Sequence, residues 1–261
     1  MKASVNKFGR FLYWFVLASF IVPVVFLIFR LLQEPSGDAS QEGLRTKADY
    51  LLMLVQCLLG AVVLHVPQLL RNRLRLEMPA ALQIMYVFFL YCAVFLGEVR
   101  NFYYKVPHWD KWLHAFSAVM AGSLGFIIAD VLNNLKGRSS LTPLLLAVFA
   151  FCFAVSIGVL WEIYEYSVDG LLELNMQKFR LEDGTDLVGR IALKDTMNDI
   201  IIDVFGSLFA AVTGYFAVKR QNIHAKQMRE RTDEMGNSPA QPDQVHQAAQ
   251  GQKSPGLSCR S

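Results

Sequence analysis

The chain has 261 residues and 54% of them are hydrophobic, compared with about 45–50% in typical soluble domains. Its net charge is only +3, and the basic residues are spread over short loops and the tail, so nothing in the pattern predicts a nucleic-acid-binding surface. The composition predicts an integral membrane protein whose surroundings are a lipid bilayer.

Six apolar runs are long enough to cross that bilayer, because a helix rising 1.5 Å per residue needs about twenty residues to span about 30 Å of hydrocarbon. The runs cover approximately Phe11–Leu32, Tyr50–Leu70, Ala80–Gly97, Trp112–Leu132, Leu141–Trp161 and Ile200–Val218. They predict an all-α, polytopic bundle of six transmembrane helices over residues 1–218.

The first run follows Met1, Lys2, Lys7 and Arg10, as the apolar part of a signal peptide would. Its apolar stretch is too long for a signal peptide, and no small-residue cleavage pattern follows it. We therefore expect it to remain as a membrane anchor.

The loops and the tail predict how the chain lies in the membrane. Thirteen Lys or Arg residues near the amino terminus, the second and fourth connections and the end of the last span fall on one side, against ten on the other. Positive charge marks the cytoplasmic side, so both termini are expected there. Residues 219–261 are polar and rich in Gln, Pro and Ser, and they are expected to form a disordered cytoplasmic tail.

The last three spans carry ionisable residues at one membrane level. Asp110 and His114 begin the fourth span, Glu162, Glu165 and Asp169 end the fifth, and Asp195, Asp199 and Asp203 begin the sixth. At 100° per residue, each set lies on one stripe of its helix. A charge facing lipid is costly, so the stripes should converge inside the bundle, where their excess negative charge predicts a bound cation or shared protons.

Small residues continue the same stripes into the membrane. Gly206, Ala210 and Gly214 follow Asp203, Ala118, Ala121 and Gly125 follow His114, and Gly158 lies one turn before Glu162. Such spacing lets helix backbones approach closely in lipid.

Carboxylates with one imidazole suit a divalent cation such as Mg, Mn or Zn. The predicted metal ligands are Asp110, His114, Glu162, Glu165, Asp199 and Asp203, and the predicted catalytic residues are Asp110, His114, Glu162 and Asp199. A purely structural interpretation stays open, because Asp110, Asp195 and Asp199 could simply cap their helices.

Four motifs occur in series: WDKWLH (109–114), WEIYEYSVD (161–169), Met176-Gln177 and DTMNDIIIDVFGSLFAAVTG (195–214). In this order they resemble the YjdF family of uncharacterised bacterial inner-membrane proteins. More distantly the pattern is similar to VanZ-like proteins, through Asp110-Lys111-x-x-His114 and a late Asp199 followed by Gly206, although Asp203 stands where those proteins have Asn. The resemblance implies a six-helix protein of the bacterial inner (cytoplasmic) membrane and supplies no activity.

Three functions fit these observations. The outward-facing site could hold a divalent cation that activates water against an envelope or lipid-linked substrate. Alternatively, the intramembrane carboxylates could serve an ion- or proton-coupled transporter. A third interpretation is a non-catalytic membrane scaffold in which the acidic cluster joins three helices.

Overall fold

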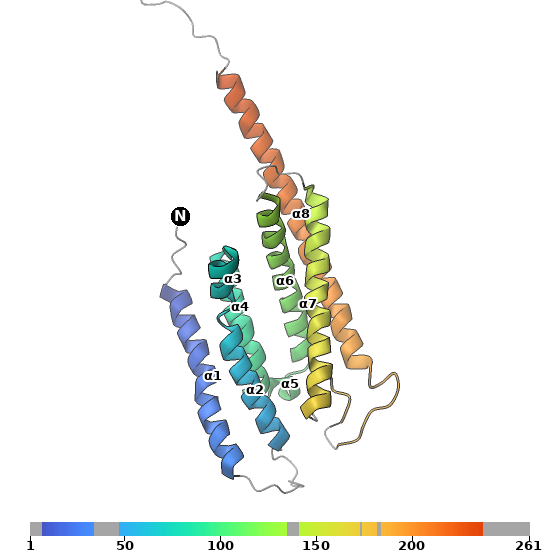
Figure 1. Ribbon diagram of the computed structural model, residues 1–261. Helices are drawn as coiled ribbons and strands as arrows, with labels where there is room; N and C mark the ends of the chain where they lie inside the picture. Colours follow the sequence, from blue (N-terminus) through green and yellow to red (C-terminus); the bar gives the residue numbers. More distant parts are fainter. Residues whose placement is uncertain (1–6, 34–46, 135–140, 173, 182–183, 237–261) are drawn as a thin grey trace, which may run out of the picture. The chain divides into compact units, whose positions relative to one another are not determined.

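The computed structural model describes residues 7–33, 47–134, 141–172, 174–181 and 184–236 (Figure 1). Within these ranges the chain is nearly all helical, and its only extended pairing is an isolated bridge between Arg180 and Asp186. Six helical segments are long and apolar enough to span a membrane, namely Lys7–Leu32, Tyr50–Leu74, Ala80–Val99, Trp109–Asn133, Pro143–Leu172 and Lys194–Asp233. The predicted all-α fold with six candidate spans is confirmed.

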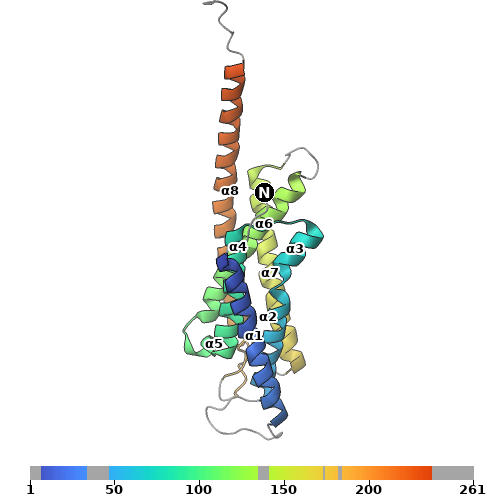
Figure 2. The ribbon, with the colours of Figure 1, turned by 90° about the vertical axis from the view of Figure 1, so that its left-hand side faces the viewer.

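The helices in chain order are α1 (Lys7–Gln33), α2 (Lys47–Val63), α3 (Val66–Leu74), α4 (Ala80–Leu90), the π-helix η1 (Tyr91–Val99), α5 (Phe102–Lys105), α6 (Trp109–Asn134), α7 (Pro143–Leu172) and α8 (Lys194–Gly236). In the amino-terminal half, α1 packs on α2 and α4 around buried side chains such as Val16, Phe20 and Cys57. In the other half, α6 and α7 pack along each other (Figure 2). The bundle thus has two groups of helices, which meet where α4 and η1 contact α6.

The second predicted span is interrupted, because α2 ends at Val63 and α3 begins at Val66. Pro67 has no N–H with which to continue the helical bonding to the Val63 carbonyl. The hydroxyl of Tyr86, from α4, donates a hydrogen bond of 2.6 Å to that carbonyl instead. A side chain from a neighbouring helix therefore compensates for the break inside the apolar region.

Small residues set the spacing between α6 and the other two helices of its half, α7 and α8. A Cβ on Gly206 would lie 2.8 Å from the Cβ of Ala118, and one on Gly122 would lie 2.6 Å from that of Ala210. On a neighbouring stripe of α6, a Cβ on Gly125 would lie 2.9 Å from the Cα of Ala150 in α7. The predicted close approach of these helices is present, since none of the three glycines has room for a methyl group.

Three of the helices extend well beyond the predicted apolar runs, and α8 does so at both ends. At one end, α6 begins at Trp109, α7 continues to Leu172, and α8 begins at Lys194. These extensions are the polar stretches that carry the acidic residues, so apolar length alone underestimates the helices. The fourth extension is at the other end of α8.

The helix α8 continues to Gly236 and so includes residues 219–236 of the predicted tail. Residues 219–236 are rich in Lys, Arg, Gln, Glu and Met, which have high helix propensity, and Lys226 pairs with Glu230 at 3.8 Å. A helix therefore forms there without an apolar face. The remainder of the predicted tail, residues 237–261, lies outside the described residues.

We predict that Gly206→Ala destabilises the bundle by about 1–3 kcal/mol, because its methyl group would force α6 and α8 apart. The matched control is Gly170→Ala on α7, where a Cβ meets nothing within 4 Å and the better helix propensity of Ala should give a neutral or slightly stabilising change. Denaturant-induced unfolding in detergent micelles measures both variants. Equal stability of the two variants would contradict the close packing inferred for Gly206.

Candidate metal site

The polar ends of α6, α7 and α8 bring the predicted site residues together. The first turns of α6 supply Asp110, Lys111 and His114, and the first turns of α8 supply Asp195, Asp199 and Asp203. The last turns of α7 contribute Glu162 and Glu165. Most of these side chains are deeply buried, with only 2% of Asp199 and Asp203 exposed.

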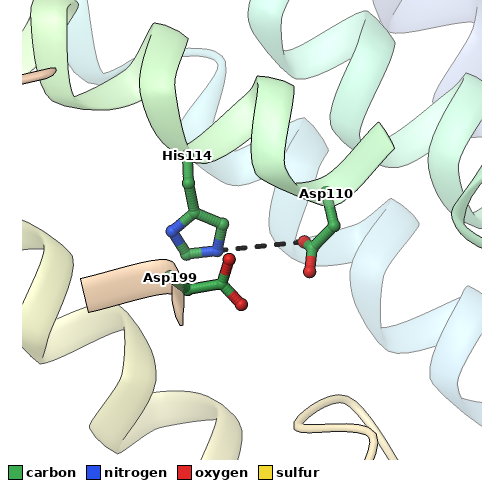
Figure 3. A group of neighbouring side chains, drawn as sticks. All are labelled: Asp110, His114 and Asp199. Carbon is green, nitrogen blue, oxygen red and sulfur yellow. Dashed lines mark ion pairs between the residues drawn. The ribbon is translucent and has the colours of Figure 1, made fainter. Parts of the chain in front are cut away.

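Three of the residues form a compact group that we call the Asp-His cluster: Asp110, His114 and Asp199. One ligand atom from each lies within 4.8 Å of the other two. Figure 3 shows the three side chains, two from α6 and one from α8, pointing toward one another. One nitrogen and two carboxylate oxygens at this separation form a ligand set suited to a single divalent cation.

The imidazole of His114 is held between carboxylates on its two sides. Its Nδ1 lies 3.2 Å from Oδ2 of Asp203, while its Nε2 lies 3.8 Å from Oδ1 of Asp110 and 3.7 Å from Oε1 of Glu162. If Nδ1–H donates to Asp203, the lone pair of Nε2 faces the Asp-His cluster, which is the usual arrangement of a metal-binding histidine and its supporting carboxylate. Asp203 therefore lies on the far side of the ring from the cluster.

Gly158 of α7 makes room for that supporting carboxylate. A Cβ at this position would overlap the carboxylate of Asp203. The sequence suggested a close approach at Gly158 because it lies one turn before Glu162. In the structure, the absence of a side chain at Gly158 leaves space for the carboxylate of Asp203 beside His114.

Two lysines neutralise the outer carboxylates. Lys111 donates from Nζ to Asp195 Oδ1 and to Asp199 Oδ2, each at 2.6 Å. Lys178 donates to Asp110 Oδ2 at 2.6 Å and lies 3.2 Å from Asp195 Oδ2. Burial alone would lower the pKa of Lys178, but Asp110 and Asp195 raise it well above its ordinary value. Lys178 is therefore a permanent positive charge.

The deeper carboxylates have incomplete hydrogen bonding. Both oxygens of Glu162 and one oxygen each of Asp199 and Asp203 are buried without a hydrogen-bond partner among the described residues. Glu162 is only 4% exposed. Buried polar atoms are almost always hydrogen-bonded, so the unpaired oxygens of Glu162 and Asp199 beside the Asp-His cluster favour a ligand that binds there.

Glu165 and Asp169 have different surroundings, although the sequence placed them on the same stripe as Glu162. Glu165 accepts a hydrogen bond of 2.8 Å from the indole N–H of Trp161 and lies outside the Asp-His cluster. Asp169 accepts hydrogen bonds from the backbone N–H groups of Met176, at 2.8 Å, and Gln177, at 2.9 Å. Asp169 therefore anchors the loop that follows α7.

This loop places Lys178 in the site, a role that no pattern in the sequence indicated. Asn175 stabilises the turn by bonding the backbone N–H and the carbonyl of Arg180, at 2.9 and 2.7 Å. Gln177 donates to the hydroxyl of Thr196 on α8 at 2.8 Å. Lys178 itself has a left-handed backbone conformation, with φ of 51°. Only the folded loop brings this cation to Asp110.

The site opens into a large cavity of about 960 Å³ between the two groups of helices. Asp110, His114 and Asp203 line one end of it, together with Tyr103. Tyr103 lies beyond the end of η1, and its ring occupies the space that a Cβ on Gly97 would need. Burial, followed by the charges of Glu98 and Asp110, raises the pKa of Tyr103 well above its ordinary value, so its hydroxyl remains a neutral donor.

Comparisons with known proteins agree with the membrane architecture. A family model described as "Predicted membrane protein (DUF2238)" matches residues 12–220. An uncharacterised protein of Thermotoga maritima is 30% identical over 131 residues, which are 50% of this chain and 59% of that protein. The chain thus spans less than two thirds of that relative's length. No solved structure matches. The narrower resemblances to the YjdF family and to VanZ-like proteins stay predictions.

We predict that Asp169→Asn loosens the loop that carries Lys178, because an amide retains only one oxygen to accept the two backbone N–H groups. A hydrogen bond to a charged acceptor contributes about 1.5–3 kcal/mol, so amide hydrogen exchange at Met176 and Gln177 should become at least about tenfold faster. Asp186→Asn is the control, because that exposed residue pairs only with Arg180 at the far side of the loop. Unchanged exchange in Asp169→Asn would contradict this anchoring.

Proposed function

The chain belongs to the DUF2238 family of membrane proteins, and on that premise we propose that its Asp-His cluster binds one divalent cation and uses it to activate water. The observation that carries the proposal is the set of buried, unpaired oxygens on Glu162, Asp199 and Asp203 around an imidazole. A purely structural cluster would be expected to satisfy those atoms within the protein.

The proposed ligands are Oδ1 of Asp110, Nε2 of His114 and the unpaired Oδ1 of Asp199. Each of the two aspartates already uses its other oxygen to accept from a lysine, which orients the carboxylate. Asp203 orients His114 from behind and is assigned no direct ligand role. A bound cation would lower the pKa of a coordinated water molecule and act as a Lewis acid.

Glu162 is the proposed general base. Its oxygens make no well-aligned hydrogen bond among the described residues, although the Thr196 hydroxyl lies close to them. Oε1 of Glu162 lies 3.7 Å from Nε2 of His114. A carboxylate at this position can accept a proton from water held beside the imidazole. The reaction class is hydrolysis, because no serine or cysteine nucleophile paired with a base lies in the cluster.

Transport is the alternative, and the polar residues farther along the bundle argue against it. His65 is engaged by the hydroxyl of Tyr13 and the carbonyl of Ala61, each at 2.9 Å. Gln83 donates to a backbone carbonyl at 2.8 Å, and Asp130 is exposed on the outside of α6. These residues support the helices and form no chain of ionisable groups leading away from the site.

A non-catalytic scaffold remains a second alternative, and the lysine pairs favour it in part. Lys111 joins α6 to α8, and Lys178 joins the loop to both helices. These pairs account for the outer carboxylates only. They leave Glu162 and Asp203 without a cation other than His114.

We predict that the purified protein binds about one equivalent of Mn²⁺ or Zn²⁺, and that His114→Ala or Asp199→Asn reduces this binding at least about tenfold through loss of a ligand. Metal analysis and titration calorimetry in detergent measure the stoichiometry and the affinity. Circular dichroism and size-exclusion chromatography verify that each variant is folded.

The matched control is His108→Ala, which removes an exposed histidine just before α6 and should leave the metal content unchanged. Absence of metal from the folded native protein after loading with either ion would contradict the proposal. Retention of a full equivalent by folded His114→Ala would contradict the ligand assignment.

We also propose that the site faces the outer side of the bacterial inner membrane, with both termini in the cytoplasm, because Lys and Arg residues are in excess at the opposite end. In a background with all four cysteines replaced, Gly184→Cys should react with a membrane-impermeant maleimide in intact cells. Arg73→Cys should react only after permeabilisation. The reverse labelling pattern would place the site on the cytoplasmic side.

A further inference from the structure

The cavity that contains the site is much longer than the site itself. Its wall on α6 runs from Asp110 to Leu124, which are fourteen residues apart and therefore about 21 Å along the helix. Beyond His114 this wall consists of Ser117, Ala118, Met120, Ala121 and Leu124. One end of the cavity is thus ionic, and the rest is lined almost entirely by apolar groups.

The other helices around the cavity also contribute polar residues at its ionic end and apolar residues elsewhere. Glu98 and Tyr103 line the ionic end, while Leu90 and Ala93 line the apolar part from α4 and η1. Leu70 and Met78 close its far end. A ligand that fills this space must carry a polar group at one end of a long apolar body.

The cavity lies among helices long and apolar enough to span a membrane. Both α2 and α7 contribute residues to its lining. A cavity with apolar walls is unfavourable for water, and in a bilayer the surrounding solvent is hydrocarbon. The bilayer therefore supplies ligands of the required shape.

The charges at the ionic end indicate the polar group. Lys178 lines the cavity and uses two of its three N–H donors on Asp110 and Asp195. Arg180 lines the same end. An anionic oxygen could accept from these cations and complete the coordination of a metal at the Asp-His cluster. A bare anion without that metal would be repelled by the surrounding carboxylates.

We propose that the cavity binds a membrane lipid by its hydrocarbon chain and places the lipid's phosphate headgroup against the Asp-His cluster and Lys178. This inference rests on the proposed divalent cation, which offsets the negative charge of the carboxylates, and it names the substrate class of that site. The lipid is then the substrate: Glu162, 3.7 Å from His114, accepts a proton from water as the water oxygen bonds to phosphorus. The ester P–O bond breaks, and the proton is returned to the leaving alcohol.

The experiment compares lipid and metal content in the same full-length preparations. The protein carries Glu162→Gln, which removes the proposed general base so that bound phospholipid is not hydrolysed. It is reconstituted with phosphatidylglycerol or with diacylglycerol of the same chains, washed in detergent, and analysed by mass spectrometry of extracted lipid. The variants Ala121→Trp and Ala93→Phe fill the cavity from opposite walls. Ala217→Trp, on an exposed position of α8 outside the cavity, is the matched control.

We expect about one retained phosphatidylglycerol per chain, at least about tenfold less in either cavity-filling variant, and no loss in the control. Diacylglycerol should not be retained, and removal of the metal with a chelator should release the phospholipid. Metal content should be unchanged in Ala121→Trp and Ala93→Phe, which also shows that they are folded.

Equal retention in the cavity-filling variants and the control would overturn the proposal, since the lipid would then be bound only to the outer surface. Equal retention of diacylglycerol would overturn the assignment of the phosphate. If metal is still bound, either of these two results leaves the proposed cation site intact. If the native protein binds no metal, the proposed cation site and the proposed lipid site are both wrong.

Discussion

Carboxylates can be held inside an apolar bundle only if other groups replace the water that they lose. In this protein six carboxylates, from Asp110 on α6, Glu162 and Glu165 on α7, and Asp195, Asp199 and Asp203 on α8, share the positive charge of two lysines and one histidine. That balance satisfies the outer acids and leaves the deeper ones with unpaired oxygens. The arrangement of the three helices follows from this requirement.

The small residues are what allow the charges to meet. Gly206 and Gly122 let α6 and α8 approach closely, and Gly158 leaves space for Asp203 beside the imidazole. With larger side chains at these positions, His114 and Asp203 would be held too far apart for their 3.2 Å contact. The same small residues therefore allow both the close packing of the helices and the contacts within the site.

The cavity extends from the ionic site into the apolar part of the bundle. The two groups of helices meet through α4, η1 and α6, and the space left beside that contact connects the ionic end to an apolar interior. A break in the second span at Pro67 and the π-helix η1 lie on the walls of this space. Irregular helices of this kind are common at functional sites, because they reposition side chains that a regular helix would direct elsewhere.

The sequence by itself determined the membrane class, the six spans and the residue types of the site, because hydrophobic length and helical periodicity are local properties. It also predicted that the acidic stripes face inward, from the cost of exposing charge to lipid. It did not reveal Lys178, whose contact with Asp110 spans 68 positions and depends on a loop folded by Asn175 and Asp169. Nor could the sequence distinguish the role of Asp203, which contacts Nδ1 of His114, from the roles of Asp110 and Asp199 in the Asp-His cluster. The cavity likewise exists only in the tertiary structure, because its walls come from distant segments whose separation is set by packing.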